Sequence, residues 1–134
     1  MMNYWAILTM TVLSFALGSV WFSTLFGKTW RKIHGAENKT AEEMKEAMKG
    51  SKGLMFTEFM ITLVMNIVLY LFVQITTVPL LVAFILWLGF VLPATTSGII
   101  WGNDEKRFMF KKIIISSAYR LVVLLVSAYV FFMW

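Results

Sequence analysis

Four long apolar segments divide the chain, and short or polar stretches separate them. They cover residues 4–26, 54–75, 78–101 and 113–134. An α-helix rises about 1.5 Å per residue, so each segment is long enough to cross a hydrocarbon core about 30 Å thick. The pattern predicts an all-α integral membrane protein, a four-helix transmembrane bundle that forms a single domain over residues 1–134.

The composition favours the same class of protein. Hydrophobic residues make up 60% of the chain and charged residues only 14%, whereas about a quarter of the residues are charged in soluble domains. The chain has no cysteine, which excludes disulfides and thiolate metal sites. No basic residue precedes the first apolar segment, so we expect that segment to be retained rather than cleaved as a signal peptide.

Basic residues mark the two polar loops, residues 27–53 and 102–112. All the Lys and Arg residues of the chain lie in these loops except Arg120. The positive-inside rule places such loops in the cytoplasm. We therefore expect a multi-pass protein of the cell membrane with its N- and C-termini outside. The net charge of +5 is then an orientation signal rather than a sign of nucleic acid binding. The expected partners are the lipid bilayer and anionic lipids at the basic loops.

The first loop contains the pattern of a short amphipathic helix, "TAEEMKEAMKG". Thr40 and Glu43 have the spacing of a capping box, and Gly50 is placed to end the helix. One face is apolar and consists of Ala41, Met44 and Met48. We expect this helix to lie along the inner membrane surface, as a spacer between the first two segments rather than a docking surface.

Two charged residues lie inside the apolar segments. Glu58 is the only acidic residue there and Arg120 the only basic one. An ionised side chain at the bilayer centre costs about 2.5 to 3.5 kcal/mol on insertion scales, so each needs a partner. Their expected depths overlap. We therefore expect Glu58 and Arg120 to pair and to join the second and fourth helices.

The other polar candidates gather in the cytoplasmic third of the membrane, around the expected ion pair. They are Ser23, Thr96, Ser97, Ser116, Ser117 and Tyr119, and Asn66 lies deeper, near the midplane. Polar residues in membrane helices face neighbouring helices or a water-filled cavity. All of them are therefore candidates either for binding a ligand or for supporting the ion pair.

Two further features concern the geometry of the helices. Pro93 lacks an N–H and frees the carbonyl of Gly89, so these two residues predict a break in the third helix. The break is either a packing kink or a functional site. Trp21 and Trp87 lie deeper in their segments than the other tryptophans, and we interpret them as packing residues rather than ligand platforms.

The chain offers little catalytic or metal-binding chemistry. His34 is its only histidine, and one histidine without cysteines or clustered carboxylates makes a poor metal site. No histidine or aspartate lies inside the apolar segments, so no Ser-His-Asp triad can form there. Glu58 as a lone base has no second catalytic group beyond Arg120. We expect no metal, no cofactor and no enzymatic activity.

Three separated motifs are similar to a known family. The first segment contains "LGSVWFSTLFGKTW", the third contains "WLGFVLP", and the last contains "AYRL" ahead of a terminal Trp. In this order, over nearly the whole chain, they resemble the small bacterial membrane proteins of the domain of unknown function 1761 family. The resemblance implies a four-helix protein of the bacterial inner membrane and brings no established activity. Phe22 stands where a tyrosine is most often expected, which argues against a hydroxyl role there.

Two functions of different classes are compatible with these patterns. The polar residues could form a cytoplasm-facing vestibule of a transporter or channel-like protein, in which Arg120 attracts an anionic small solute or a lipid headgroup. Four short helices enclose little volume, so a pathway would need a homo-oligomer. Alternatively, the protein is structural or accessory, and the same polar residues only hold the helices together. The sequence leaves both open.

Overall fold

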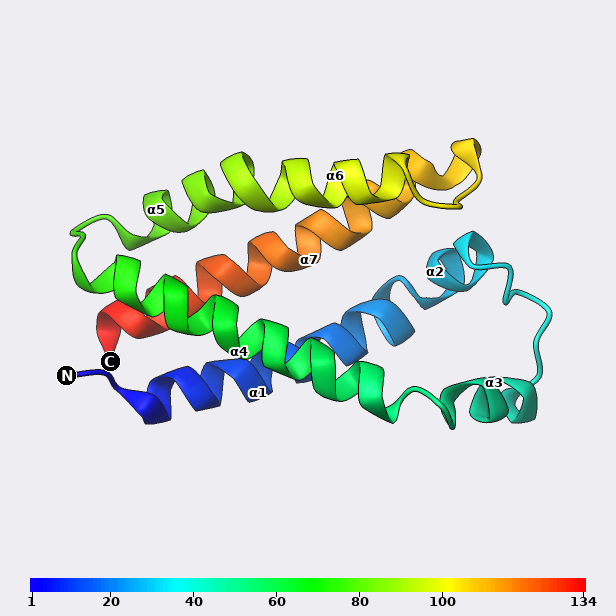
Figure 1. Ribbon diagram of the computed structural model, residues 1–134, viewed down its shortest axis with the longest axis horizontal. Helices are drawn as coiled ribbons and strands as arrows, with labels where there is room; N and C mark the ends of the chain where they lie inside the picture. Colours follow the sequence, from blue (N-terminus) through cyan, green and yellow to red (C-terminus); the bar gives the residue numbers. More distant parts are fainter.

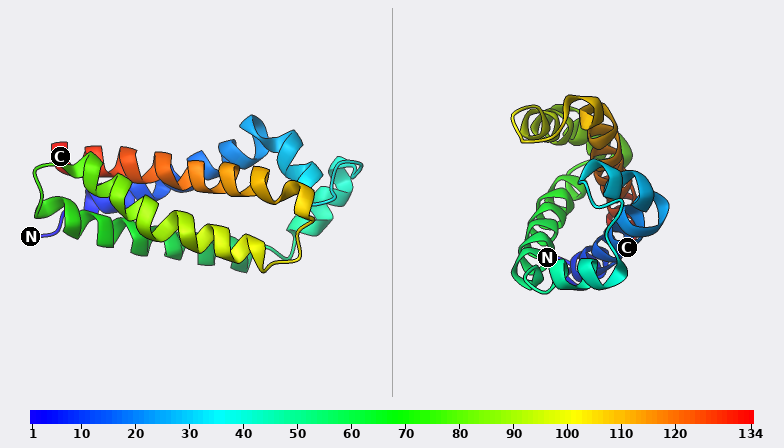
Figure 2. Two further views of the ribbon diagram at one scale, coloured as in Figure 1. Left: turned by 90° about the horizontal axis from the view of Figure 1, so that it is seen from above. Right: turned by 90° about the vertical axis from the view of Figure 1, so that its right-hand side faces the viewer.

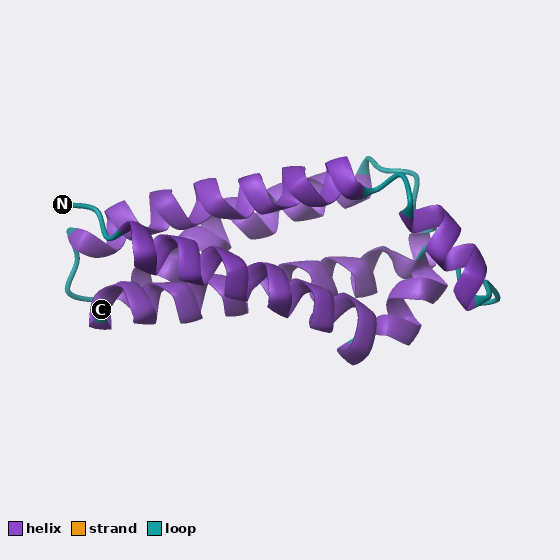
Figure 3. Ribbon diagram, turned by 90° about the horizontal axis from the view of Figure 1, so that it is seen from below, coloured by secondary structure: helices purple, strands orange, loops and turns teal.

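The computed structural model describes all residues from Met1 to Trp134, and it contains helices and loops but no strand (Figure 3). Several of the helices follow one another without a loop. In chain order the elements are α1 (Tyr4–Val20), η1 (Trp21–Leu25), α2 (Gly27–Ile33), α3 (Ala41–Met48), α4 (Lys52–Gln74), α5 (Pro79–Leu86), η2 (Trp87–Val91), α6 (Leu92–Ile100) and α7 (Lys106–Met133). The expected all-α class is therefore confirmed.

Four continuous helices are long and apolar enough to cross a membrane, as the apolar pattern predicted. They are Tyr4–Leu25, Lys52–Gln74, Pro79–Ile100 and Lys106–Met133. The first three begin and end within a few residues of the predicted bounds. The fourth begins at Lys106, whereas we expected residue 113, so most of the predicted loop 102–112 is helical. Lys, Arg and Met are good helix formers, so the basic residues of this stretch extend the helix rather than end it.

Both chain termini lie at one end of the molecule (Figure 1). The link between α4 and α5 lies at this end too, which we call the terminal end. The opposite end holds α2, α3 and the link between α6 and α7 (Figure 1). We call it the basic end because eleven of the twelve Lys and Arg residues lie there, in residues 27–53 and 102–112. The molecule thus has one end with few charges and one end rich in cations.

The helix formed by α5, η2 and α6 is the least enclosed of the four. Only 6% of its apolar window is buried, against 28 to 39% in the other three. α5 packs against α4 and α7, whereas α6 packs against α7. Seen from the basic end, α4 and α6 flank an open side of the molecule (Figure 2). The seam between α4 and this helix is therefore closed only near the terminal end.

The main core lies at the terminal end, between α1, α4, α5 and α7. Alanines at three helix contacts, Ala6, Ala83 and Ala128, are fully buried. Small residues let helix backbones approach closely in a membrane, where lipid tails are as apolar as the side chains. Tyr70 closes this core, because its ring packs edge-on against Phe131 with 5.4 Å between centroids. A second, smaller cluster at the basic end joins Ile33, Phe108 and Ile115.

The first loop holds two helices, of which only α3 was predicted. The capping box at its start is present: the Glu43 N–H donates to Thr40 Oγ1 at 3.2 Å, and the Thr40 N–H donates to Glu43 Oε2 at 3.0 Å. α3 ends at Met48, and Gly50 follows in the turn. The one positive φ of the chain, 67°, belongs to Gly35, just after α2.

Two π-helical turns interrupt the four long helices. One, η2, begins at Trp87 and lies directly before Pro93, where the sequence predicted a break. The N–H of Leu92 bonds to the carbonyl of Trp87, five residues back, and the helix continues into α6. The break is therefore a widened turn within a continuous helix. The other, η1, begins at Trp21 and was not predicted.

Candidate functional site

A polar cavity of about 470 Å³ lies between the four long helices, in the half of the molecule nearer the basic end. Each of the four long helices contributes to its lining: Phe15, Gly18 and Ser19 of α1, Phe22 of η1, Glu58 of α4, Thr95 of α6, and Ser116, Tyr119 and Arg120 of α7. Six of these nine residues are not hydrophobic. A cavity of this size and polarity inside apolar helices is suited to holding water or a polar ligand.

Arg120 and Glu58 form an ion pair in the wall of this cavity. Arg120 Nη2 donates to Glu58 Oε1, which joins α7 directly to α4. The Arg120 side chain is 18% exposed and the Glu58 side chain 43% exposed, so the carboxylate is the more open of the two. Arg120 Nη1 is buried and makes no hydrogen bond. The pair therefore joins two helices and still leaves one guanidinium donor unsatisfied.

Tyr119 forms the wall beside the ion pair, and its hydroxyl is held. Tyr119 Oη donates to the Ser14 carbonyl on α1 at 2.7 Å. The ring lies so close to α1 that a Cβ built on Gly18 would come within 2.8 Å of the hydroxyl oxygen. The Arg120 guanidinium lies 5.3 Å from the centre of the same ring, within the range of a cation–π contact. The absence of a side chain at Gly18 thus leaves space for the Tyr119 ring, which contacts the Arg120 guanidinium.

Two tryptophans fix α7 by donating to its backbone. Trp21 Nε1 donates to the Ile115 carbonyl at 3.0 Å, and Trp87 Nε1 donates to the Ser117 carbonyl at 2.7 Å. Each of these tryptophans is the first residue of a π-helical turn. The sequence predicted only packing here. A signal was available, because an indole N–H deep in an apolar segment needs an acceptor, and a neighbouring backbone carbonyl supplies it.

The hydroxyl candidates divide into residues that line the cavity and residues that do not. Ser116 and Tyr119 line it, together with Ser19 and Thr95, which were not predicted as site residues. Four candidates lie outside the lining: Ser23 and Ser97, which are exposed on the helix surface, Thr96, which is half-buried, and Ser117, which is buried. The Ser23 hydroxyl donates to the Ser19 carbonyl, and the Ser117 hydroxyl donates to the Ile113 carbonyl, both within their own helices.

Asn66 also lies outside the cavity, in the dry contact between α1 and α4. Its side chain is 1% exposed, and Nδ2 donates to Thr11 Oγ1 at 3.2 Å. The Thr11 hydroxyl in turn donates to the Ile7 carbonyl at 2.8 Å. Asn66 therefore acts as a polar contact between two helices. Gly89 and Pro93 are both exposed and do not line the cavity either.

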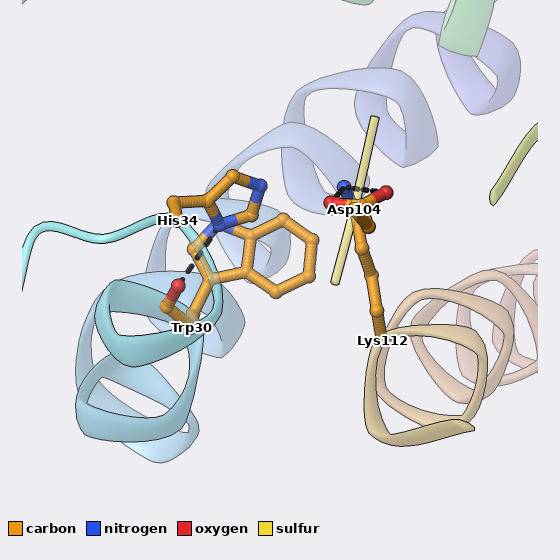
Figure 4. A network of polar contacts seen from close by, with 4 residues as sticks. All are labelled: Trp30, His34, Asp104 and Lys112. Atoms are coloured by element: carbon orange, nitrogen blue, oxygen red, sulfur yellow. Dashed lines mark hydrogen bonds and ion pairs between the residues drawn. The ribbon is translucent and has the colours of Figure 1, made fainter. Parts of the chain in front are cut away.

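An aromatic and charged group lies at the basic end (Figure 4). Phe22, from the cavity wall, packs on Trp30 with 4.5 Å between ring centroids, and Trp30 packs on His34 at the same distance. Lys112 Nζ pairs with the carboxylate of Asp104 at 2.8 and 3.0 Å, and both side chains are largely buried. No group of three or more histidine or carboxylate side chains is placed to hold a metal ion.

Comparison with known proteins identifies one family. The sequence model of the family described as "Protein of unknown function (DUF1761)" matches residues 5–132, nearly the whole chain. This match confirms the resemblance found in the three sequence motifs. No curated protein and no solved structure matches the chain.

Proposed function

The chain belongs to the family described as Protein of unknown function (DUF1761), and we propose that it is a membrane protein that binds the anionic group of a small solute or of a lipid headgroup in its polar cavity. Arg120 supplies the positive charge, and the cavity hydroxyls supply further hydrogen bonds. In this role the protein is a transporter or channel-like protein, and the cavity is its cytoplasm-facing vestibule.

One observation carries the proposal. Arg120 lines a cavity of about 470 Å³, its side chain is 18% exposed, and Glu58 accepts a hydrogen bond from only one of its nitrogens. A charged side chain in a low-dielectric region is stabilised by further hydrogen bonds, which a ligand or a bound water in the cavity can accept. Arginine also suits phosphate and carboxylate groups, because its planar fork can donate two parallel hydrogen bonds.

The membrane arrangement is part of the same proposal. The four long helices cross the bilayer as a bundle, with the basic end in the cytoplasm and both termini outside. α3 lies on the inner surface, an arrangement supported by the exposure of Met48 and Ala41 on its apolar face. Because one chain encloses only a partial cavity, a complete pathway would be formed by a homo-oligomer.

A binding or transport role suits the cavity better than an enzymatic one. The cavity lining contains hydroxyls and a single carboxylate, but no histidine, cysteine or second carboxylate that could activate a nucleophile. The alternative function is structural. It is favoured by the direct contact of Arg120 with Glu58 and by the indole bonds to α7, which would hold the helices together without any ligand.

Binding can be tested on the purified protein in a non-ionic detergent. The thermal unfolding temperature is measured while inorganic phosphate or glycerophosphoethanolamine is added. We expect a saturable rise for the wild-type protein, because a ligand that binds the folded state stabilises it. Arg120→Met should remove the rise, whereas the same substitution at the exposed Arg107 should not. A double variant, Glu58→Gln with Arg120→Met, controls for an unpaired carboxylate.

The absence of any response that depends on Arg120 would contradict the proposal and leave the structural function. Transport is tested separately in liposomes that contain the protein, by following flux of anionic solutes and transfer of labelled lipid between leaflets. Both activities should be lost in Arg120→Met and retained in Arg107→Met.

A further inference from the structure

An apolar groove lies along the seam between α4 and the helix formed by α5, η2 and α6, separate from the polar cavity. Its volume is about 350 Å³, and every lining residue is hydrophobic, including Val64, Val68 and Phe72 of α4, Leu86 of α5, Phe90 of η2 and Leu124 of α7. No polar residue faces it. It is therefore suited to a hydrocarbon chain rather than to a soluble solute.

The groove and the cavity lie one after the other along the same three helices. Leu124 lies about one turn beyond Arg120 on α7, and Val64 lies between one and two turns beyond Glu58 on α4. On the third helix, which runs the opposite way, Phe90 precedes Thr95 by about one turn and so lies on the same side of it. The polar site is thus at the basic-end side of the seam, and the apolar groove lies about one turn farther toward the terminal end.

The charges of the cavity favour a headgroup that carries both signs. Arg120 and Glu58 are the only ionisable cavity residues besides Tyr119, so the formal charge of the lining is zero. The side chains of Arg120 and Glu58 are 18% and 43% exposed, and only one carboxylate oxygen of Glu58 accepts a hydrogen bond. A phosphate placed at Arg120 and an ammonium group placed at Glu58 would satisfy both residues, whereas a simple anion would satisfy only one.

We propose that the seam binds a zwitterionic phospholipid, with its phosphate and amine against Arg120 and Glu58 and an acyl chain in the apolar groove. This inference rests on the proposed function and names its ligand class. The lipid enters from the bilayer between α4 and α6, the side that the helices leave open (Figure 2). The headgroup then lies in the leaflet at the basic end, and the chain follows the seam toward the membrane midplane.

The test is lipid binding measured by native mass spectrometry on the full chain in non-ionic detergent. Dioleoyl phosphatidylethanolamine, dioleoyl phosphatidylglycerol and tail-free glycerophosphoethanolamine are the probes. Burial of an acyl chain adds affinity for each methylene, so the tail-free probe should bind at least about tenfold more weakly than the ethanolamine lipid. The ethanolamine lipid should also bind more tightly than the glycerol lipid, and Glu58→Gln should reduce that preference.

A pair of matched substitutions locates the acyl chain. Val68→Trp places a large ring in the groove, and Val12→Trp places the same ring on the lipid-facing side of α1; the two valines are 45% and 51% exposed. We expect Val68→Trp to weaken binding of the ethanolamine lipid at least about tenfold, with no change in binding of the tail-free probe, because the groove holds only the chain. Val12→Trp should bind like the wild-type protein.

Three results would overturn the inference, and they differ in what they leave standing. If the lipid and the tail-free probe bind equally, no acyl chain is bound in the groove. The same follows if Val68→Trp and Val12→Trp have equal effects. Either result leaves the anion site standing. Tighter binding of the glycerol lipid would remove the zwitterionic headgroup. No binding that depends on Arg120 for any probe would remove the proposed function as well.

Discussion

Two polar contacts on α4, about two turns apart, differ in how completely their hydrogen bonds are satisfied. Asn66 is 1% exposed and bonded to Thr11, whose hydroxyl is bonded in turn to α1. Glu58 is 43% exposed beside a cavity, and its partner Arg120 keeps one buried nitrogen without a hydrogen-bond partner. Both contacts join helices, but only the second borders a cavity. Exposure to a cavity, rather than polarity itself, is what separates the proposed binding site from a contact that only joins two helices.

The largest expected effect concerns ligand binding. Arg120→Met should cost about 2 to 5 kcal/mol of binding free energy for a phosphate group, as removal of a charged, hydrogen-bonded partner does in other complexes. Asn66→Leu should leave this binding unchanged, because Asn66 lies outside the cavity. Titrations of both variants with glycerophosphoethanolamine measure the difference. Loss of binding in both would show that the two contacts do not differ as described.

A smaller effect, on stability, is expected where α1 meets Tyr119. Gly18→Ala would place a Cβ within 2.8 Å of the Tyr119 hydroxyl, so the ring must move and the bond to the Ser14 carbonyl must weaken. Overpacking of this kind costs about 1 to 3 kcal/mol. Gly98→Ala on α6 is the control, since its Cβ would meet nothing within 4 Å. In detergent, Gly18→Ala should unfold at a lower temperature than Gly98→Ala. Equal unfolding temperatures would contradict the close contact between α1 and the Tyr119 ring.

The two indole bonds to α7 should contribute less. Trp21→Phe and Trp87→Phe each remove one interhelical hydrogen bond, and such bonds in membranes are worth from about 0.6 to about 1.7 kcal/mol. Trp101 is exposed and makes no side-chain hydrogen bond, so Trp101→Phe is the matched control. Chemical unfolding in mixed micelles measures all three. If Trp101→Phe lowers the free energy of unfolding as much as Trp87→Phe does, the cause is the smaller ring and not the lost hydrogen bond.

The smallest effect should come from the dry contact. A double-mutant cycle of Thr11→Val and Asn66→Leu should give a coupling of about 0.6 kcal/mol, the average for polar pairs in a membrane helix bundle. The coupling energy from the same cycle for Glu58→Gln and Arg120→Met should change when phosphate is added, because phosphate competes with Glu58 for the Arg120 guanidinium. If the coupling energy between Thr11 and Asn66 also depended on phosphate, the two contacts would not differ as described.

Much of the fold was predictable from local pattern, because hydrophobic length alone specifies a membrane-spanning helix. The capping box of α3 was predictable for a similar reason, since it depends on residues three positions apart. The structure also brings Glu58 and Arg120 together, as counting the charges in the apolar segments suggested. Each of these features follows from one segment or from a charge that has a single possible partner.

The faces that the helices turn toward one another were harder to predict. Thr95 lines the cavity, whereas Thr96 and Ser97 were expected to do so. The π-helical turn η2 precedes them, and one extra residue in a turn rotates everything after it by about 100° relative to an unbroken helix. Every fourth residue of α4 from Glu58 to Gln74 is polar, and Asn66 was expected near the cavity because it belongs to this stripe. The drift of that stripe around α4 carries it instead to the contact with α1.

The central claim is that a phosphate group binds to the Arg120 guanidinium. It can be tested by solid-state NMR, by measuring the dipolar coupling between phosphorus and arginine side-chain nitrogen in ethanolamine-lipid bilayers. Arg31→Lys and Arg107→Lys make Arg120 the only arginine and preserve the charge of the loops. We predict a coupling that corresponds to direct phosphate contact and that disappears when unlabelled arginine is used. A protein that is folded in these bilayers but shows no such coupling would contradict the account.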